Sequence, residues 1–297
     1  MTGVGKPSFS RRVFIFSNYI ILTAVALVCF LPMWHVLMAS ISDPAKVAMN
    51  TSLLFKPVGK MTTKGYELVL TNKNLIRSYL NTFFYISGSL LTGMTITILG
   101  GYVLSRRNTI WGPKISMLIV FTMLFNGGLI PYYMLVRSLG WLNSPLALII
   151  PGSVSVYNMM VMRTGFSQVP EELVESARID GASELTILLK IVLPLSKAVV
   201  AVIVLFYLVQ QWNSWFYPMI FMSERTRYPL QLWLRELLIQ QNQAVMSQSG
   251  EMTSEMEKYR ELYRYAAIII STVPILTVYP FAQKYFVKGV MLGSVKG

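Results

Sequence analysis

Residues 13–42 read VFIFSNYIILTAVALVCFLPMWHVLMASIS and contain no Asp, Glu, Lys or Arg. A helix of about 20 consecutive apolar residues is long enough to cross the hydrocarbon core of a membrane. The bilayer interior offers no water to satisfy backbone N–H and C=O groups, so a spanning segment there has to be a helix or part of a closed barrel. This stretch therefore predicts a membrane-spanning helix near the N-terminus.

Five further windows lack charged residues in the same way, and with the first they make up half of the chain: 78–105, 115–136, 138–162, 198–223 and 265–283. The next longest charge-free stretch, 237–250, is polar and rich in Gln, so it does not predict a span. We therefore predict an all-α, polytopic membrane protein with six transmembrane helices, near 14–37, 80–104, 115–136, 143–162, 192–214 and 264–286.

The composition excludes several classes of active site. Charged residues make up 13% of the chain and mean hydropathy is +0.53, whereas soluble proteins carry about 25% charged residues. One His and one Cys leave no zinc site of the His/Cys type, no disulfide within the chain, and no Ser-His-Asp or Cys-His catalysis except through His35. Helix packing is the simpler interpretation of both His35 and Cys29. We predict no catalytic residue and no metal, although catalysis by carboxylates alone stays open.

The positions of Lys and Arg in the short loops predict the orientation. The loop between the second and third spans carries Arg106, Arg107 and Lys114, whereas the next loop carries Arg137 alone. Basic residues concentrate in short cytoplasmic loops, so both termini are predicted to be cytoplasmic. This orientation gives a single six-helix domain over 14–286, inside segments at 1–13 and 287–297, and outside segments at 38–79 and 215–263.

Two other interpretations of the basic residues are less favoured. The pair Arg11-Arg12 resembles a twin-arginine export signal, but the apolar run that follows is longer than a signal peptide has, and no A-x-A cleavage site follows it. We therefore expect the first helix to be retained. Nucleic-acid binding needs a clustered basic face, and the sequence has none.

Aromatic residues gather where the second outside segment begins: Trp212, Trp215, Phe216 and Tyr217. Trp and Tyr are enriched where a membrane meets water, so an interfacial belt is one interpretation. A surface that meets a sugar or a sugar-carrying protein is the other. The two can hold together.

Residues 169–194, between the fourth and fifth predicted spans, do not fit a simple helical bundle. Pro170 followed by two glutamates is typical of a helix start, and Asp180-Gly181 interrupts that helix. Ser183 is the predicted N-cap of a second helix over 184–193. The sequence therefore predicts two short helices joined by a sharp bend. Such an elbow either caps the bundle as a surface helix or receives force from a soluble partner, and the residues alone leave both open.

The spacing Glu175-Ser176-Ala177-x3-Gly181-x9-Ile191-x-Leu193-Pro194 resembles the EAA loop of permease subunits of bacterial ABC importers. The family pattern is E-A-A-x3-G-x9-I-x-L-P, and Ser176 is the only departure from it. Trp212-Asn213 and the segment 288–297 resemble the carbohydrate branch of the family. The segment 126–131, NGGLIP, resembles a sub-branch that imports oligosaccharides released from complex polysaccharides. The resemblance extends from about residue 80 to the C-terminus.

The resemblance implies an importer in the bacterial inner membrane with two permease subunits, two cytoplasmic ATPase subunits and an extracytoplasmic sugar-binding protein. This chain would form a heterodimer with a related permease, surrounded by membrane lipid, and would itself be no enzyme. ATP and Mg would be bound by the partner ATPase, because this chain has no G-x4-G-K-[ST] loop to hold phosphate.

The resemblance also assigns roles to residues. Closure of the ATPase dimer would swing the elbow and open the pore outward, with Glu175 as a polar contact and Gly181 as the bend. The candidate coupling residues are Glu171, Glu175, Ala177, Arg178, Asp180 and Gly181. The candidate C-terminal contacts to the ATPase are Ser294, Val295, Lys296 and Gly297. The candidate pore or substrate residues are Asn126, Trp212, Asn213 and Trp215, with close helix packing as the alternative around Asn126.

An autonomous secondary transporter or channel is the alternative function. A secondary transporter usually has ionisable residues at the membrane midplane, which the predicted spans lack, and a channel needs no elbow for an ATPase. The expected substrate is an oligosaccharide, and the sub-branch favours an acidic one such as alginate or a pectin fragment. Six basic residues of the outside segment suit an acidic ligand or a solvated surface equally: Lys46, Lys56, Lys60, Lys64, Lys73 and Arg77.

Overall fold

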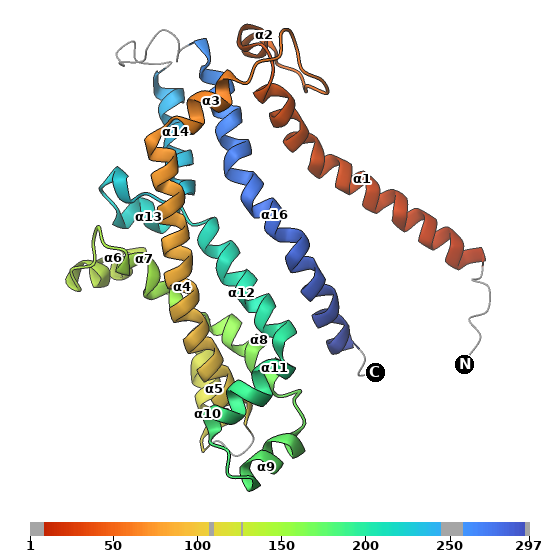
Figure 1. Ribbon diagram of the computed structural model, residues 1–297, viewed down its shortest axis with the longest axis vertical. Coiled ribbons are helices and arrows are strands. Elements are labelled where there is room, and N and C mark those ends of the chain that lie inside the picture. The colour runs from red at the N-terminus through yellow and green to blue at the C-terminus, as the bar shows by residue number, and fades with distance from the viewer. Residues whose placement is uncertain (1–8, 107–109, 126, 245–257, 295–297) are drawn as a thin grey trace. The chain divides into compact units, whose positions relative to one another are not determined.

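The computed structural model describes residues 9–106, 110–125, 127–244 and 258–294. Every regular element in these ranges is a helix, which confirms the predicted all-α fold (Figure 1). Packing contacts divide the chain into two compact units, one within 1–72 and 238–270 and the other within 73–237 and 271–297. The domain limits predicted from the sequence stay predictions.

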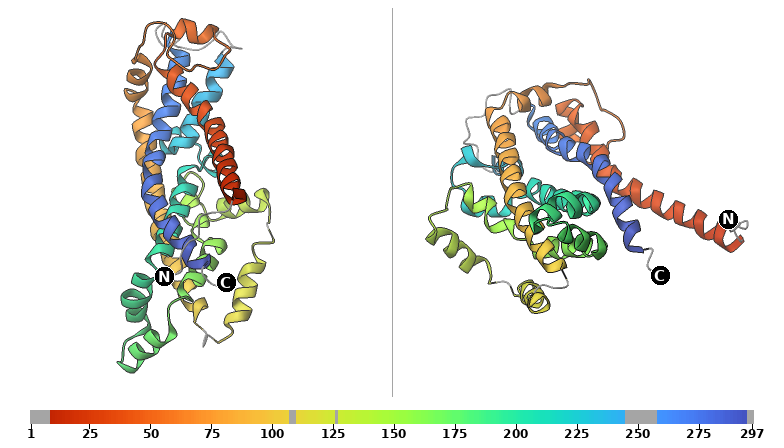
Figure 2. Two further views of the ribbon diagram at one scale, coloured as in Figure 1. Left: turned by 90° about the vertical axis from the view of Figure 1, so that its right-hand side faces the viewer. Right: turned by 60° about the horizontal axis from the view of Figure 1, so that its bottom comes forward.

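The larger unit is built around α4 (Lys73–Ser105), which packs against α8 (Val156–Phe166) and α12 (Lys197–Trp212) (Figure 2). Residues four apart share a helix face, and small side chains there let helix backbones approach closely. A Cβ built on Gly93 would lie 2.9 Å from the Tyr207 ring, so a larger residue does not fit without displacing that ring. The buried face of α4 carries small residues at every fourth position: Ser89, Gly93, Thr97 and Gly101.

A buried polar junction joins α4, α12 and the short 3-10 helix η1 (Pro151–Ser153). The Tyr207 hydroxyl donates to the Ser153 carbonyl oxygen at 3.2 Å and lies 2.8 Å from the Thr97 hydroxyl. A phenol carries one proton, so Thr97 is the donor in the second contact. The chain bends by 45° between η1 and α8, and Tyr207 satisfies a carbonyl group at that break, where no water is at hand in a membrane.

The first half of α4 holds the segment that follows α12. Tyr85 Oη donates to the Arg227 carbonyl oxygen at 2.8 Å, and Thr82 Oγ1 accepts from Leu230 N at 2.8 Å. These bonds fix both ends of a short turn to one helix. The elements after α12 are α13 (Phe216–Phe221), η3 (Arg225–Arg227), α14 (Leu230–Ala244) and α16 (Arg260–Ser294).

Some predicted spans are single long helices in the structure, and others are bent or divided. Three helices are long and apolar enough to cross a membrane: α1 (Phe9–Ser40), α4 and α16. The predicted spans 143–162 and 192–214 correspond to helix pairs bent by 45° and 87°. The predicted span 115–136 is divided between α5 (Gly112–Phe121) and α6 (Leu129–Ser138). The described residues thus contain three spanning helices, or five if each bent pair counts as one; the number six stays a prediction.

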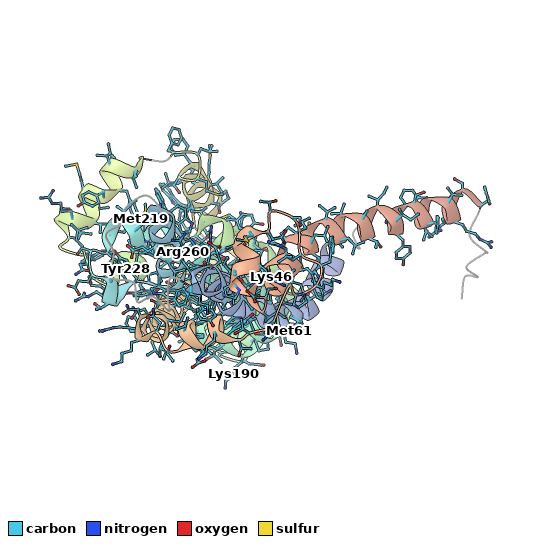
Figure 3. The ribbon with its side chains drawn as sticks, turned by 90° about the horizontal axis from the view of Figure 1, so that it is seen from above. Lys46, Met61, Lys190, Met219, Tyr228 and Arg260 are labelled. Atoms are coloured by element: carbon cyan, nitrogen blue, oxygen red, sulfur yellow. The ribbon has the colours of Figure 1, made fainter. Side chains whose placement is uncertain are left out.

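The smaller unit contains α1, α2 (Pro44–Met49) and α3 (Lys64–Leu70). The most apolar 18-residue window of α1 has no buried residue, and its side chains project on all sides of the helix (Figure 3). A helix that is apolar all round needs lipid or another helix against it. Only the last turns of α1 pack within the unit, in a small core that contains Met38, Ala39, Val47, Leu54 and Leu262.

The segment after α1 is tied back to the end of that helix. His35 Nδ1 accepts a hydrogen bond from Leu54 N at 3.0 Å, and its ring meets Tyr265 edge-on with centroids 5.9 Å apart. Ser42 Oγ accepts from Val58 N at 3.0 Å. His35 therefore has a packing role, as the sequence predicts, and holds a loop against the helix end.

Candidate functional site

The elbow, residues 170–195, begins with α9 (Glu171–Ile179). Pro170 lies at the N-cap, with φ −54° and ψ 130°, one position earlier than the sequence predicts. Glu171 and Glu172 occupy the first turn and Arg178 the last, so the charges complement the helix dipole. The predicted helix start is thus confirmed to within one residue.

The bend after α9 is a Schellman motif. Gly181 N donates to the Arg178 carbonyl oxygen at 3.0 Å, and Ala182 N donates to the Ala177 carbonyl oxygen at 2.9 Å. Gly181 has φ +80°, a region where a residue with a Cβ is strained. The structure confirms Gly181 as the bend and gives the reason: the motif needs a left-handed residue at this position.

The second arm of the elbow consists of α10 (Glu184–Ile187), η2 (Leu188–Val192) and α11 (Leu193–Leu195). Ser183 Oγ accepts from Thr186 N at 3.3 Å, which confirms the predicted N-cap. The turn η2 is a π-helix directly ahead of Pro194. Proline cannot donate to the turn before it and its ring needs room there, and a wider turn relieves both constraints. This arm meets α12 at 87°.

The inner face of the elbow is apolar and packs into the main core of the larger unit. Val174, Ile187 and Leu188 are buried with Tyr102 and Phe166 in one cluster. Ala177 and Ala182 pack against the same cluster. Both ends of the longer Schellman bond are therefore small residues at the core edge. The elbow moves only if this packing moves with it.

The outer face of the elbow presents the remaining predicted coupling residues. Glu175 and Asp180 are exposed, and Ile179 is exposed to 87%, more than almost any other apolar side chain described. Glu171 and Arg178 are half-buried. A short helix with an anchored inner face and an exposed, partly apolar outer face is suited to dock into a groove on another protein. The structure thus brings the predicted coupling residues onto one protruding element.

Glu184 is the functional candidate that sequence reasoning missed. Its carboxylate accepts from Tyr102 Oη at 2.5 Å and from Arg178 Nε at 2.7 Å. The Arg178 hydrogen bond, and then the Tyr102 hydrogen bond, hold the pKa of the Glu184 carboxyl below its usual value. Glu184 follows the Ser183 N-cap, so the sequence shows it only as a first-turn glutamate. Its contact with Tyr102, 82 residues away, comes from tertiary packing.

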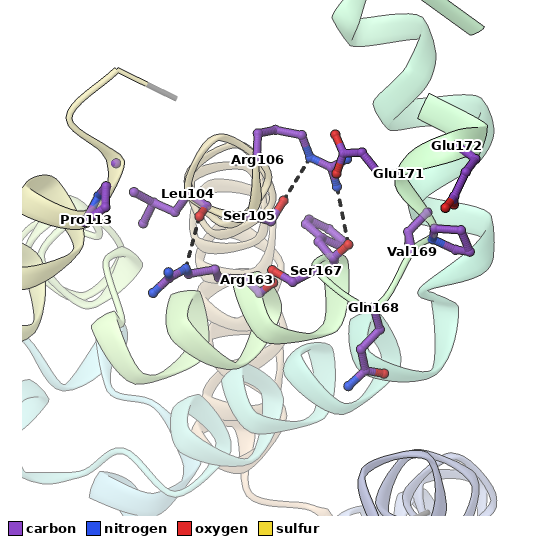
Figure 4. A pocket seen from close by; sticks show the side chains of 13 residues that line it. Leu104, Ser105, Arg106, Pro113, Arg163, Ser167, Gln168, Val169, Glu171 and Glu172 are labelled. Carbon is purple, nitrogen blue, oxygen red and sulfur yellow. Dashed lines mark hydrogen bonds between the residues drawn. The ribbon is translucent and has the colours of Figure 1, made fainter. Parts of the chain in front are cut away.

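Two arginines clamp the ends of α4 and α8 beside the elbow (Figure 4). Arg163 Nε, on α8, donates to the Leu104 carbonyl oxygen of α4 at 3.0 Å, and Arg106 Nη2, just after α4, donates to the Phe166 carbonyl oxygen of α8 at 3.3 Å. Each arginine thus satisfies a terminal carbonyl group of the other helix. A cavity of about 740 Å³ lies between this clamp and the first turn of α9, which contributes Glu171 to its wall.

A second cavity, of about 880 Å³, has a different chemistry. No Lys, Arg, Asp or Glu lies among its described lining residues. Its polar side chains are Thr122, Ser155, Gln210, Gln211 and Ser214, and its aromatic ones are Tyr132, Phe216 and Tyr217. Amide and hydroxyl groups beside aromatic faces form a site for an uncharged, hydroxyl-rich ligand surface. We name this the amide cavity.

The structure places the predicted pore residues beside the amide cavity rather than in its wall. Trp212 is only 3% exposed, with Tyr79 and Phe83 rings about it at 6.3 and 6.1 Å. Asn213 Nδ2 donates to the Val209 carbonyl oxygen of its own helix at 2.9 Å. Trp215 carries the Arg235 guanidinium over its ring at 4.8 Å. Asn126 lies outside the described residues.

The aromatic cluster seen in the sequence therefore divides in two. Trp212 belongs to helix packing, whereas Phe216 and Tyr217 line the amide cavity. Gln210 and Gln211 line it as well, and sequence reasoning did not select them. The sequence does contain a signal for these two residues. They are adjacent amides at the end of an otherwise apolar helix, where polar side chains usually have a functional role.

The predicted C-terminal contacts to the ATPase fall at the limit of the structure. Ser294 is the last residue of α16. Val295, Lys296 and Gly297 lie outside the described residues. Their role stays a prediction.

Residues 73–292 match the model of the family described as the binding-protein-dependent transport system inner membrane component. This chain belongs to that family. The matched range contains the elbow, the arginine clamp and the amide cavity. The chain is accordingly a permease subunit of an ABC importer and no enzyme, and it is an inner-membrane component. Within the described residues, no group of three or more His, Cys, Asp or Glu side chains could hold a metal ion.

Similar proteins extend over the whole chain. A Bacillus subtilis protein described as the polygalacturonan/rhamnogalacturonan transport system permease protein YtcP is 36% identical over 97% of this chain and 99% of its own length. The protein LplC of the same organism is 34% identical over 96% of both chains. A crystal structure of a bacterial ABC transporter involved in the import of the acidic polysaccharide alginate contains a chain that matches with a TM-score of 0.84 and 29% identity, over 95% of this chain and 100% of that one.

Proposed function

We propose that this chain forms one half of the translocation pathway of an ATP-driven importer for acidic oligosaccharides. A second, related permease supplies the other half, and an extracytoplasmic binding protein delivers the sugar. Both termini and the elbow lie on the cytoplasmic side. The family match over residues 73–292 is the observation that carries this proposal, because it contains both the elbow and the amide cavity. It favours an importer subunit over an autonomous transporter or channel.

The elbow is the docking element for one of two ATPase subunits, which bind ATP and Mg. Its exposed outer face, with Glu175 and Ile179, supports this role. Ile179 offers apolar surface beside charged residues, which a partner that docks on α9 can bury. The C-terminal residues 294–297 are proposed as a second contact to the ATPase.

The substrate class rests on the similar proteins. YtcP is described as a permease for polygalacturonan and rhamnogalacturonan, and the structurally similar transporter is involved in the import of the acidic polysaccharide alginate. The amide cavity indicates that this chain binds only part of the substrate. Because no charged side chain lies among its described lining residues, it meets the hydroxyl groups and ring faces of the sugar. The carboxylates of the substrate are then neutralised by the partner permease or the binding protein.

A transport experiment tests this proposal. The importer is reconstituted in liposomes from this chain, its partner permease, its ATPase and its binding protein, and uptake of labelled pectin and alginate fragments is measured. ATP-dependent uptake of an acidic oligosaccharide, absent without the binding protein, is the expected result. Uptake of neutral oligosaccharides alone would overturn the substrate class, and uptake by this chain alone would overturn the importer assignment.

The amide cavity has its own test in the same system. Gln210→Ala and Gln211→Ala each remove one amide from the cavity wall and are expected to raise the KM for uptake about tenfold, the effect of losing one or two hydrogen bonds to a ligand. Asn213→Ala removes an amide that caps its own helix, so it lowers thermal stability and leaves KM unchanged. A rise in KM for Asn213→Ala alone would place the sugar on the other face of α12.

A further inference from the structure

One carboxylate joins the elbow to the central helix of the larger unit. Tyr102 lies in the last turn of α4 and is only 6% exposed, and its hydroxyl donates to Glu184 Oε2 at 2.5 Å. Arg178, in the last turn of α9, donates through Nε to Glu184 Oε1 at 2.7 Å. Glu184 itself is the first residue of α10. Both oxygens of one carboxylate are thus engaged, and they join three helices.

Apart from the apolar packing of Val174 and Ile187 in the core, the two arms of the elbow are connected through the Schellman bend, and a backbone bend is a natural hinge. The Arg178–Glu184 ion pair bridges the bend from one arm to the other, at residues six positions apart. Its side chains are 34% and 55% exposed, so it contributes little to stability as an isolated surface pair. Its position is the informative feature, because it bridges α9 and α10 across the bend.

The Tyr102 contact fixes that body to α4. The Arg106 guanidinium lies over the Tyr102 ring, 5.0 Å from its centroid, and Arg106 also belongs to the clamp that holds α8. The phenol is therefore held in place between a buried core and a cation. A short hydrogen bond to a carboxylate from such a fixed donor is strong and directional.

We infer that Glu184 is a positioning residue for energy coupling, through which displacement of α9 by a soluble partner is transmitted to α4. This inference rests on the proposed docking of an ATPase on the elbow. Without the link, α9 contacts α4 only through the apolar packing of Val174 in the cluster that contains Tyr102, so less of the work done on the elbow reaches α4. With it, α4 follows, and the face of α4 that packs on α8 and α12 follows with it.

The test compares two tyrosines of the same helix. Tyr102→Phe removes the hydroxyl that contacts Glu184, and Tyr85→Phe removes a hydroxyl that donates at 2.8 Å to a backbone carbonyl group near the other end of α4. Both tyrosines are buried, at 6% and 2% exposure, and each variant removes one hydroxyl with its hydrogen bond. The assembled importer is measured for ATPase activity with and without sugar-loaded binding protein, and for sugar transported per ATP hydrolysed.

Tyr102→Phe and Glu184→Gln are expected to assemble and to keep basal ATPase activity, while sugar transported per ATP falls about tenfold, as for the loss of one charge-assisted hydrogen bond. Tyr85→Phe is expected to leave this ratio unchanged. Arg178→Glu is expected to lower the sugar transported per ATP in the same way as Glu184→Gln. The double variant Arg178→Glu, Glu184→Arg re-forms the ion pair across the bend and is expected to recover part of the coupling.

Equal losses for Tyr102→Phe and Tyr85→Phe would overturn the inference, because they would reflect stability alone. A normal ratio of transport to ATP in Glu184→Gln would overturn it as well. The unmodified importer separates this outcome from a failure of the proposed function. If its ATPase ignores the loaded binding protein, the proposed function is wrong; if it responds and the variants match it, only the role of Glu184 is wrong.

Discussion

Single residues set the shape of the elbow. Gly181 supplies a left-handed backbone conformation, and the small Ala177 accepts the longer bond of the motif at the edge of the core. A Cβ at Gly181 would meet no atom within 4 Å, so a substitution there acts through backbone strain and not through a clash. This makes Gly181 a clean position for testing whether elbow geometry matters for transport.

Gly181→Ala is expected to lower coupled sugar uptake severalfold, because the strain of about 1 to 2 kcal/mol favours opening of the bend. The matched control is Gly140→Ala. Gly140 has φ +68°, also has open space around a Cβ, and ends α6 in the same Schellman pattern, with Trp141 N bonded to the Val136 carbonyl oxygen. Uptake and thermal unfolding are measured for both. An equal loss of uptake in the two variants would show that backbone strain at another glycine lowers uptake as much as strain at the elbow.

The Glu184 carboxyl also predicts a dependence on pH. Its pKa is lowered below the usual 4.5 by the hydrogen bond from Arg178 and then by that from Tyr102. A group with a lower pKa in the folded state stabilises the fold above its unfolded pKa, and this contribution is lost as pH falls through the folded value.

The difference in Tm between the unmodified chain and Glu184→Gln is therefore expected to be constant from about pH 7 to 5 and to shrink below about pH 4. Thermal unfolding in detergent measures it. Glu172→Gln, an exposed glutamate of the same elbow, is expected to show a smaller difference at every pH. A difference for Glu184→Gln that persists undiminished at the lowest pH would contradict the ionised link.

At the scale of elements, α4 organises the larger unit. Its small-residue face receives α8 and α12, its first half holds the turn around Arg227, and its last turn meets the elbow. Helix α12 has two distinct faces at its end, with Trp212 in the core and Gln210 and Gln211 at the amide cavity. Helix α4 therefore contacts α12 directly, and α12 contributes Gln210 and Gln211 to the cavity wall.

Gly93→Ala tests the close approach of α4 and α12. The new Cβ would lie 2.9 Å from the Tyr207 ring, and such overpacking typically costs about 1 to 3 kcal/mol. The expected result is a lower Tm in detergent and weaker protection of the Tyr207 region from proteolysis. Gly152→Ala is the control, because a Cβ there meets nothing within 4 Å. An unchanged Tm for Gly93→Ala would show that Tyr207 moves aside without cost.

At the scale of the whole molecule, the chain has exposed surfaces that suit contact with lipid or with other subunits. The apolar window of α1 has no buried residue, and the elbow carries its most polar face outward. A permease subunit of this family works inside an ABC importer, so these surfaces are expected to be covered in the assembly or by lipid. Orientation in the membrane then decides which partners can reach which surface.

Cysteine labelling tests the orientation. In a Cys29→Ser background, Ser176→Cys on the elbow is expected to react with a membrane-impermeant maleimide only in inside-out vesicles, since Ser176 is exposed and the proposed topology places the elbow on the cytoplasmic side. Met61→Cys, at a position 71% exposed in the segment after α1, is expected to react only in spheroplasts. Reaction of both positions from the same side would contradict the predicted topology. Protection of Ser176→Cys by the ATPase would support docking there.

The sequence by itself determined the all-α membrane fold, because six charge-free windows are each long enough for a helix that crosses the bilayer. It also located the elbow and its bend, since proline, glycine and the N-cap serine act through local backbone geometry. The residues that cap the ends of the two elbow helices, such as Ser183, were predictable for the same reason. Local rules are sufficient wherever the partners are a few residues apart.

Tertiary structure decided everything that depends on distant contacts. It divided the predicted span 115–136 between α5 and α6, and it bent the other two broken spans at 154–155 and at 196. It placed Trp212 in the core and Gln210 in the wall of the amide cavity. The sequence does not show which face of α12 is buried, because apolar residues surround most of the helix. It paired Glu184 with Tyr102 across 82 residues. The physical reason is that burial and hydrogen bonding between elements depend on which helices are neighbours, and only the folded chain fixes that.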